Sequence, residues 1–335
     1  MASPATERTR WLALAAKLAV TVALLVVVAR LADPIAAARE LAGAGAGGLT
    51  LAFVLNGLSV AVSAARWQRV LARLGERVAL RDLVADVLVG TTYNLLLPTS
   101  IGGDVARSLR CARRVGVPEH AWASVAFERL IGLLALVAVS GAGLATIARG
   151  RAGWLGGVAA VVVVVVVGAL LGLPVALRGA AHVRRFGWER AASAFERVGA
   201  ALAGPLASPA ARLEALAWSV GYHVTALALL VPLGWAWGEP RLLEAVFLGV
   251  PLALVATVLP ISVGGLGVRE SLMVVVLAPF GLSAPRALAL GAAWLASMIV
   301  VALAGAGVLL LERSGPSRSP PGHAIEGDGD GAGVR

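Results

Sequence analysis

Cysteine, histidine and charged residues are all scarce in this chain of 335 residues. Cys111 is the only cysteine, which excludes a disulfide framework and a cysteine-ligated metal site. The four histidines lie far apart in the sequence, without the spacing of metal ligands. We therefore expect no metal and no cofactor. Charged residues make up only 14% of the chain, so the architecture must be built mostly from apolar residues.

Long apolar runs take the place of the missing charges. The mean hydropathy is +0.86. A run of valine over residues 161–167 lies inside the apolar segment 154–177, which is long enough to span about 30 Å of hydrocarbon. A buried soluble core would not need several such segments. The composition therefore predicts an all-α, polytopic membrane protein.

The basic balance of the chain fits a membrane better than a nucleic acid. The formal net charge is +10, and Lys17 is the only lysine. The arginines are concentrated in short connections between apolar segments, as the positive-inside rule requires of cytoplasmic loops. We therefore expect membrane lipids, and no nucleic acid, as partners.

One stretch of sequence occurs twice. Residues 97–107 read LPTSIGGDVAR, and residues 259–269 read LPISVGGLGVR. Leucine, proline, serine, two glycines and arginine recur at the same spacing. Each copy interrupts a hydrophobic segment with proline and glycine and then presents a charge. Within lipid, the freed backbone groups must be satisfied inside the protein or by water in a cavity.

The apolar pattern divides the chain into two halves with a tail at each end. The tails are residues 1–10 and the disordered 312–335, and the two transmembrane repeats are 11–148 and 149–311. Each half is expected to contain about three full spans and one broken hairpin. The expected spans are residues 11–31, 49–65, 121–148, 154–177, 213–237 and 284–311.

Two further kinds of segment complete the predicted layout. The segments 83–97 and 242–259 lead into the breaks, and each either re-enters on the same side or crosses fully. The basic connections 65–82 and 178–212 have apolar residues at helical spacing, which favours helices lying along the membrane surface.

The charge rule also predicts an orientation. If both basic connections are cytoplasmic, the N- and C-termini are cytoplasmic as well. The first hairpin then opens to the cytoplasm, whereas the second enters from outside. The connections at 33–40, 149–153 and 238–241 fall outside. The two halves would start on opposite sides, which is an inverted repeat of the kind found in alternating-access transporters.

The repeated motif suggests a seat for an anion. A helix beginning just after the glycine pair would present unpaired N–H groups and partial positive charge. The arginine adds a planar fork that fits phosphate oxygens. The alternative is a tight turn that lets helices pack, with both arginines snorkelling to headgroups. The predicted substrate-binding residues are Gly102, Gly103, Arg107, Gly264, Gly265 and Arg269.

Four other charged residues are candidates for gating or coupling. They are Asp104, Glu128, Arg129 and Glu270. An ionised group deep in a bilayer costs roughly 2.5–3.5 kcal/mol on insertion scales, so such groups pair or line water. We expect Glu128 and Arg129 to pair with Arg107 and Asp104 across helices. The alternative is pairs at the interface, near helix ends.

Polar residues near the breaks form a third group. Tyr93, Asn94, Ser100 and Ser262 can line a headgroup site, or can instead satisfy the interrupted backbone. His223, in the middle of a span, is expected to be a packed or cavity residue rather than a metal ligand.

These motifs together resemble a known family. The matching elements are the pair Arg66-Trp67, the stretch 97–107, the triplet Glu128-Arg129-Leu130 with Gly132, and the stretch 259–270. They resemble the transmembrane region of lysylphosphatidylglycerol synthases, a flippase-like family of bacterial and archaeal inner-membrane proteins. The resemblance implies the inner membrane and a role in moving lipid. The aminoacyl-transfer domain that normally follows this region is not expected here, so synthase activity is not implied.

Three functions remain open on the sequence. The favoured one is a lipid transporter for an anionic headgroup, which is not an enzyme. The second is a membrane transferase that uses a lipid-phosphate donor, although the sequence has no DxxD motif and no Ser/His or Cys/His constellation. The third is a non-catalytic membrane partner of a lipid-modifying enzyme or a glycosyltransferase.

Overall fold

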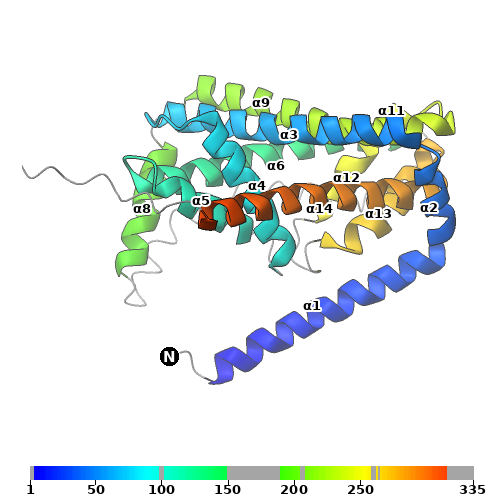
Figure 1. Ribbon diagram of the computed structural model, residues 1–335, viewed down its shortest axis with the longest axis horizontal. Coiled ribbons are helices and arrows are strands. Elements are labelled where there is room, and N and C mark those ends of the chain that lie inside the picture. The colour runs from blue at the N-terminus through cyan, green and yellow to red at the C-terminus, as the bar shows by residue number, and fades with distance from the viewer. Residues whose placement is uncertain are drawn as a thin grey trace, which may run out of the picture.

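The computed structural model describes residues 4–97, 102–148, 189–203, 208–257, 262 and 265–314. This part of the chain is helical and contains no strand (Figure 1). Its α-helices are α1 (Pro4–Leu31), α2 (Pro34–Ala42), α3 (Gly45–Arg73), α4 (Leu80–Leu96), α5 (Gly102–Ala112), α6 (Pro118–Ala148), α8 (Glu189–Ala203), α9 (Pro209–Ala228), α10 (Val231–Gly234), α11 (Leu242–Glu244), α12 (Val250–Ala256), α13 (Val268–Leu277) and α14 (Ala284–Ser314). Short π- and 3₁₀-helical turns join the later elements: η2 (Trp235–Trp237), η3 (Ala245–Gly249) and η5 (Ala278–Phe280).

Several helices meet the requirements of a membrane span. Among the described residues, four are long and apolar enough to cross: Gly45–Arg73, Pro118–Gly141, Pro209–Trp237 and Ala284–Arg313. The end of α1 and α2 form a pair bent by 74°, which makes a fifth if it is one span. The predicted span 154–177 lies outside the described residues. The all-α, polytopic membrane class is therefore confirmed.

The basic segment 65–82 differs from its prediction. Instead of a separate surface helix, α3 continues unbroken to Arg73. Trp67 and Leu71 are fully buried in a cluster with residues of α4, α5 and α6. The Trp67 indole donates a hydrogen bond of 2.8 Å to Ser124 Oγ. Helical spacing of apolar residues marks a buried face, but it does not say whether lipid or protein covers that face.

Two helical hairpins interrupt the bundle near the repeated motifs. Helices α4 and α5 pack closely because Gly90 meets Gly103, where a Cβ atom would collide with the facing carbonyl oxygen. Helices α12 and α13 form the second hairpin, and Gly265 and Gly267 turn there with φ of +76° and +80°. A Cβ on Gly267 would lie 2.8 Å from Cβ of Leu24, so α1 docks against this second tip.

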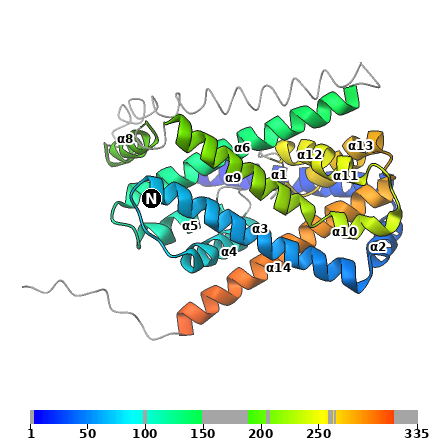
Figure 2. The same ribbon diagram turned by 90° about the horizontal axis from the view of Figure 1, so that it is seen from above.

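The two hairpins enter the bundle from opposite ends (Figures 1 and 2). On α5, Arg110 binds Glu312 at the end of α14 with two hydrogen bonds of 2.7 Å. Next to the second hairpin, Arg241 donates to the Pro279 carbonyl at 3.0 Å, close to the start of α14. Opposite entry agrees with the predicted layout, while the inverted relation of the two halves stays a prediction.

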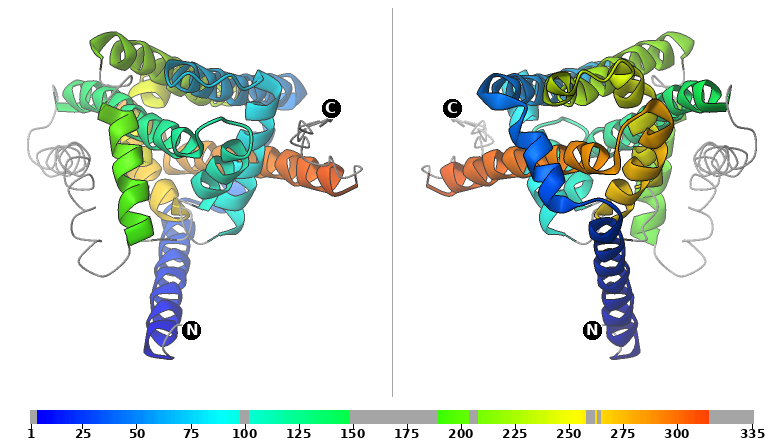
Figure 3. Two further views of the ribbon diagram at one scale, coloured as in Figure 1. Left: turned by 90° about the vertical axis from the view of Figure 1, so that its left-hand side faces the viewer. Right: turned by 90° about the vertical axis from the view of Figure 1, so that its right-hand side faces the viewer.

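Charged pairs gather at the two ends of the bundle. Figure 3 views the ribbon from each of these ends. At the first end, Arg73 binds Glu214 across α3 and α9. At the second end, Arg286 of α14 binds both Glu40 and Glu239. The connections 33–40 and 238–241, which are predicted to share one side of the membrane, therefore do lie together.

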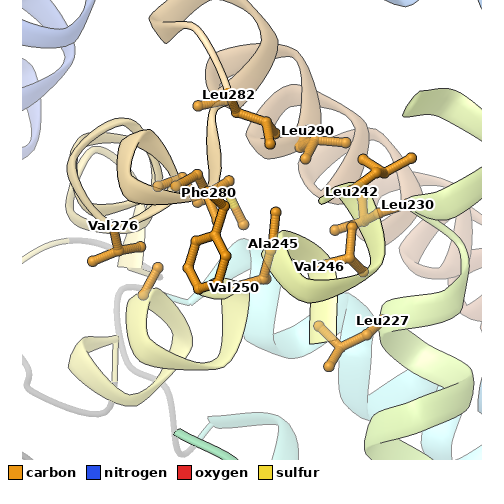
Figure 4. Close-up of a cluster of buried hydrophobic side chains, with 14 of the residues drawn as sticks. Leu227, Leu230, Leu242, Ala245, Val246, Val250, Val276, Phe280, Leu282 and Leu290 are labelled. Atoms are coloured by element: carbon orange, nitrogen blue, oxygen red, sulfur yellow. The ribbon is translucent and has the colours of Figure 1, made fainter. Parts of the chain in front are cut away.

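The largest apolar cluster in the described part of the chain surrounds η3 and the second hairpin, and Figure 4 shows part of it in close-up. Leu227, Leu230, Val246, Phe280 and Leu290 are almost fully buried there, contributed by α9, the turn before α10, η3, η5 and α14. Between helices in lipid the hydrophobic drive is weak, so close van der Waals packing and small residues hold such a cluster together.

Glycine packing between α4 and α14 offers a test of the fold. A Cβ on Gly305 would collide with the Leu88 carbonyl and the Thr92 hydroxyl, whereas a Cβ on Gly307 would meet nothing within 4 Å in the described structure. Gly305→Ala should therefore lower stability by about 1–3 kcal/mol through overpacking. Gly307→Ala, the matched control, should leave it unchanged or slightly raised. Thermal unfolding of both variants in detergent checks this, and equal midpoints would contradict the packing of α4 on α14.

Candidate functional site

A cavity of about 410 Å³ lies between the first hairpin and helices α3, α6 and α9. Its volume falls within the range of about 300–1,000 Å³ that is common for small-molecule sites. Polar and charged side chains come from each of these five helices. The lining residues are Ser63, Arg66, Val87, Gly90, Thr91, Asn94, Gly103, Asp104, Arg107, Glu128, Arg129, Leu130, Gly132, Leu133, Leu136, Tyr222 and His223.

Glu128 on α6 is the buried centre of the charged wall. Its side chain has no exposed surface. One carboxylate oxygen, Oε1, accepts a hydrogen bond of 2.8 Å from Arg66 Nε, and the other, Oε2, accepts one of 2.8 Å from Arg107 Nη1. A buried carboxylate is tolerated only when it is paired and hydrogen-bonded. Glu128 therefore ties α3 and α5 to α6.

Asp104 extends the network toward the surface. Its carboxylate accepts a hydrogen bond of 3.0 Å from Arg107 Nε and one of 2.5 Å from Arg129 Nε. The Asp104 side chain is 13% exposed, and that of Arg129 is 54% exposed. The predicted pairing of Glu128 and Arg129 with Arg107 and Asp104 across helices is thus confirmed. Three guanidinium groups and two carboxylates meet here.

The guanidinium group of each of the two buried arginines also lies over an aromatic ring. The Arg66 guanidinium carbon lies 4.9 Å from the centre of the Tyr222 ring, and that of Arg107 lies 4.9 Å from the Trp67 ring. Such cation–π contacts contribute about 0.5–2 kcal/mol each. On the wall formed by α6 and α9, His223 Nε2 lies 3.0 Å from the Gly132 carbonyl oxygen, so His223 is a cavity residue as expected.

The start of α5 differs slightly from its prediction. The helix begins at Gly102 itself rather than after the glycine pair. The N–H of Gly103 donates to Asn94 Oδ1 at 2.8 Å, so Asn94 satisfies the interrupted backbone while it also lines the cavity. Asn94 and the first-turn Asp104 therefore already occupy this helix end, and the positive groups that line the cavity are the arginine side chains.

The second motif has a different environment. Arg269 and Glu270 are both buried and bind each other, with Arg269 Nε 2.9 Å from Glu270 Oε1. The other oxygen of Glu270 accepts the N–H of Gly267 at 2.8 Å. The positive groups of this turn are therefore paired with a carboxylate of the same turn. Neither these residues nor Gly265 line the cavity.

The remaining predicted residues are placed as follows. Ser262 is buried, and its hydroxyl has no partner in the described part of the chain. Tyr93 is 37% exposed and does not line the cavity. Gly102 is half-buried at the start of α5. Ser100 and Gly264 lie outside the described residues.

Several site residues were missed by reasoning from the sequence. Arg66 was assigned to a segment on the membrane surface. The signal that could have identified it is the pair Arg66-Trp67, which is one of the motifs that carry the family resemblance. Ser63, Thr91 and Tyr222 carry no distinguishing pattern in sequence. Their roles depend on how α3, α4 and α9 face one another, which local spacing does not specify.

The chain matches a known protein family over most of its length. A family model described as "Lysylphosphatidylglycerol synthase TM region" matches residues 14–305, which include every residue that lines the cavity. The chain belongs to this family. Membership of the lysylphosphatidylglycerol synthase TM region family confirms the resemblance and indicates a multi-pass membrane protein related to lipid handling. No curated protein and no solved structure matched the chain.

The central position of Glu128 generates a stability prediction. Glu128→Gln removes the charge that neutralises Arg66 and Arg107, so it should destabilise the protein by about 3–5 kcal/mol. Glu214→Gln is the matched control, because Glu214 also binds an arginine of α3, but that pair is 31–41% exposed. An exposed pair contributes only about 0–1 kcal/mol. Thermal unfolding in detergent compares the two, and similar losses would contradict the buried role of Glu128.

Proposed function

We propose that this protein is a flippase-like lipid transporter that holds an anionic phospholipid headgroup in the cavity beside the first hairpin. The observation that carries the proposal is the excess of guanidinium groups over carboxylates in a cavity whose wall includes the buried Arg66 and Arg107. Family membership supports a role in lipid handling, and the cavity supplies the chemistry that a phosphate-bearing headgroup needs.

The arginines have donor capacity left for a ligand. Arg107 uses Nε and Nη1 on Asp104 and Glu128, and Arg66 uses Nε and Nη1 on Glu128 and Ser219. Within the described residues, no hydrogen bond is found for Nη2 of either arginine. Guanidinium groups bind phosphate oxygens with well-matched geometry. Because Arg66 and Arg107 are almost fully buried, water screens their charges little, and an anion beside them gains more than it would from arginines at the surface.

The placement of the cavity supports a transport pathway. It lies beside the broken hairpin α4–α5, and the second hairpin enters from the opposite end of the bundle. In the proposed topology, the first end of the bundle is cytoplasmic, both termini are cytoplasmic and the protein resides in the inner membrane. The headgroup would then enter the cavity from the cytoplasmic leaflet, and the two hairpins would form the moving halves of an inverted repeat.

A headgroup-accessibility assay in proteoliposomes tests the proposal. Labelled phosphatidylglycerol, aminoacyl-phosphatidylglycerol and polyprenyl phosphate serve as candidate lipids. Arg107→Gln should reduce movement to the level of protein-free liposomes, because it removes the excess positive charge. The variant should be less stable, because a buried pair is broken, but it should still fold, since Glu128 keeps Arg66 and Asp104 keeps Arg129 as partners.

Arg113→Gln is the matched control, because Arg113 follows α5, is exposed and does not line the cavity. It should move lipid as fast as the wild type. If no lipid moves, or if Arg107→Gln moves it equally well, the transporter proposal fails. The membrane-partner function would then lead, and capture of a lipid-modifying enzyme or glycosyltransferase would test it. A new lipid product formed by the purified protein would instead favour the transferase.

A further inference from the structure

The charges that line the cavity leave one positive charge in excess. Arg66, Arg107 and Arg129 contribute guanidinium groups, whereas Asp104 and Glu128 contribute carboxylates. His223 also lines the cavity, and the test below is carried out at pH 8, where an imidazole is neutral. Arg66, Arg107 and Glu128 are buried, so solvent screens their charges poorly, and a ligand whose charge restores neutrality is favoured over one that overshoots.

We propose that the cavity selects lipid headgroups with a single net negative charge, and that Asp104 is the residue that sets this selection. The inference rests on the proposed function and narrows its substrate class to phosphodiester lipids without a compensating amine. A phosphomonoester carries about −1.5 to −2 charges near pH 7. It would leave negative charge unmatched beside two carboxylates. A zwitterionic headgroup brings its own ammonium and leaves the excess charge of the cavity unmatched.

Asp104 is better suited to this role than Glu128. Glu128 is fully buried and holds Arg66 and Arg107 together, so it is part of the framework of the bundle. Asp104 is partly exposed and lies between Arg107 and the more exposed Arg129. Asp104 therefore accepts hydrogen bonds from Arg107 and Arg129, the two arginines nearest the accessible part of the network. These hydrogen bonds leave the two arginines with fewer donors for a ligand. Removing the charge of Asp104 should make a second negative charge acceptable.

Specificity is a difference between affinities, so the test compares lipids that differ in headgroup charge. Short-chain phosphatidylglycerol, phosphatidic acid and phosphatidylcholine are titrated into the full-length protein in detergent at pH 8, and binding is measured by calorimetry. The wild type should bind phosphatidylglycerol roughly tenfold more tightly than the other two lipids, which corresponds to about 1.4 kcal/mol. Asp104→Asn should reverse the order of phosphatidylglycerol and phosphatidic acid.

A second variant moves the cavity charge in the opposite direction. Arg129→Gln makes the lining neutral, and because more than half of this side chain is exposed, its loss should not prevent folding. It should weaken the binding of phosphatidylglycerol and weaken that of phosphatidic acid still more. Asp82→Asn is the control for the aspartate substitution, since Asp82 is 40% exposed and does not line the cavity. It should keep the wild-type order.

The outcomes separate this inference from the proposed function. If the wild type binds monoanionic and dianionic lipids equally, or if neither cavity variant changes their relative affinity, selection by charge is overturned while lipid transport stands. If no lipid binds and Arg107→Gln leaves headgroup movement unchanged, the proposed function itself fails. If Asp104→Asn does not fold, the predicted response of Arg129→Gln decides alone.

Discussion

A single carboxylate with no access to water constrains the first half of the bundle. Glu128 lies on α6, a helix apolar enough to span a membrane, and an unpaired charge at such a position would be severely destabilising. Its two oxygens are satisfied by arginines from α3 and α5. The need to pair Glu128 therefore fixes the positions of three helices at once. The remaining capacity of those arginines then defines the chemistry of the cavity beside them.

The two copies of the repeated motif use the same arginine differently. In the first copy, aspartate follows the glycine pair, and Arg107 is shared between Asp104 and a glutamate on another helix. In the second copy, leucine takes the place of that aspartate, and the acid comes directly after the arginine, so Arg269 pairs with Glu270 in the same turn. The first motif therefore pairs with another helix and lines the cavity. The second motif forms its ion pair within its own turn, at the tip of the second hairpin, and α1 packs against that tip.

The sequence predicted the all-α membrane class and most of the spans. It also predicted the pairing of Glu128 and Arg129 with Arg107 and Asp104. Periodicity and the cost of an unpaired charge are local or nearly local constraints, so both can be read from the sequence. It did not predict that Trp67 and Leu71 are buried between helices, since an apolar face at helical spacing suits lipid and protein equally. Nor did it predict which copy of the motif lines the cavity. That depends on the position of one acidic residue relative to each arginine, and on the approach of Arg66 and Tyr222 from distant parts of the chain.

The distribution of ion pairs also bears on how such a molecule can move. Helix α14 is bound at one end by Arg286 to Glu40 and Glu239, and at the other by Glu312 to Arg110. These pairs are more exposed than those of Glu128, so solvent screens them more and breaking them costs less, whereas breaking the pairs of Glu128 would cost several kcal/mol. A rearrangement that opens either end of the bundle would therefore break the pairs of α14 first. The group formed by Glu128, Arg66 and Arg107 would stay intact, and the cavity would keep its charge while its access changes.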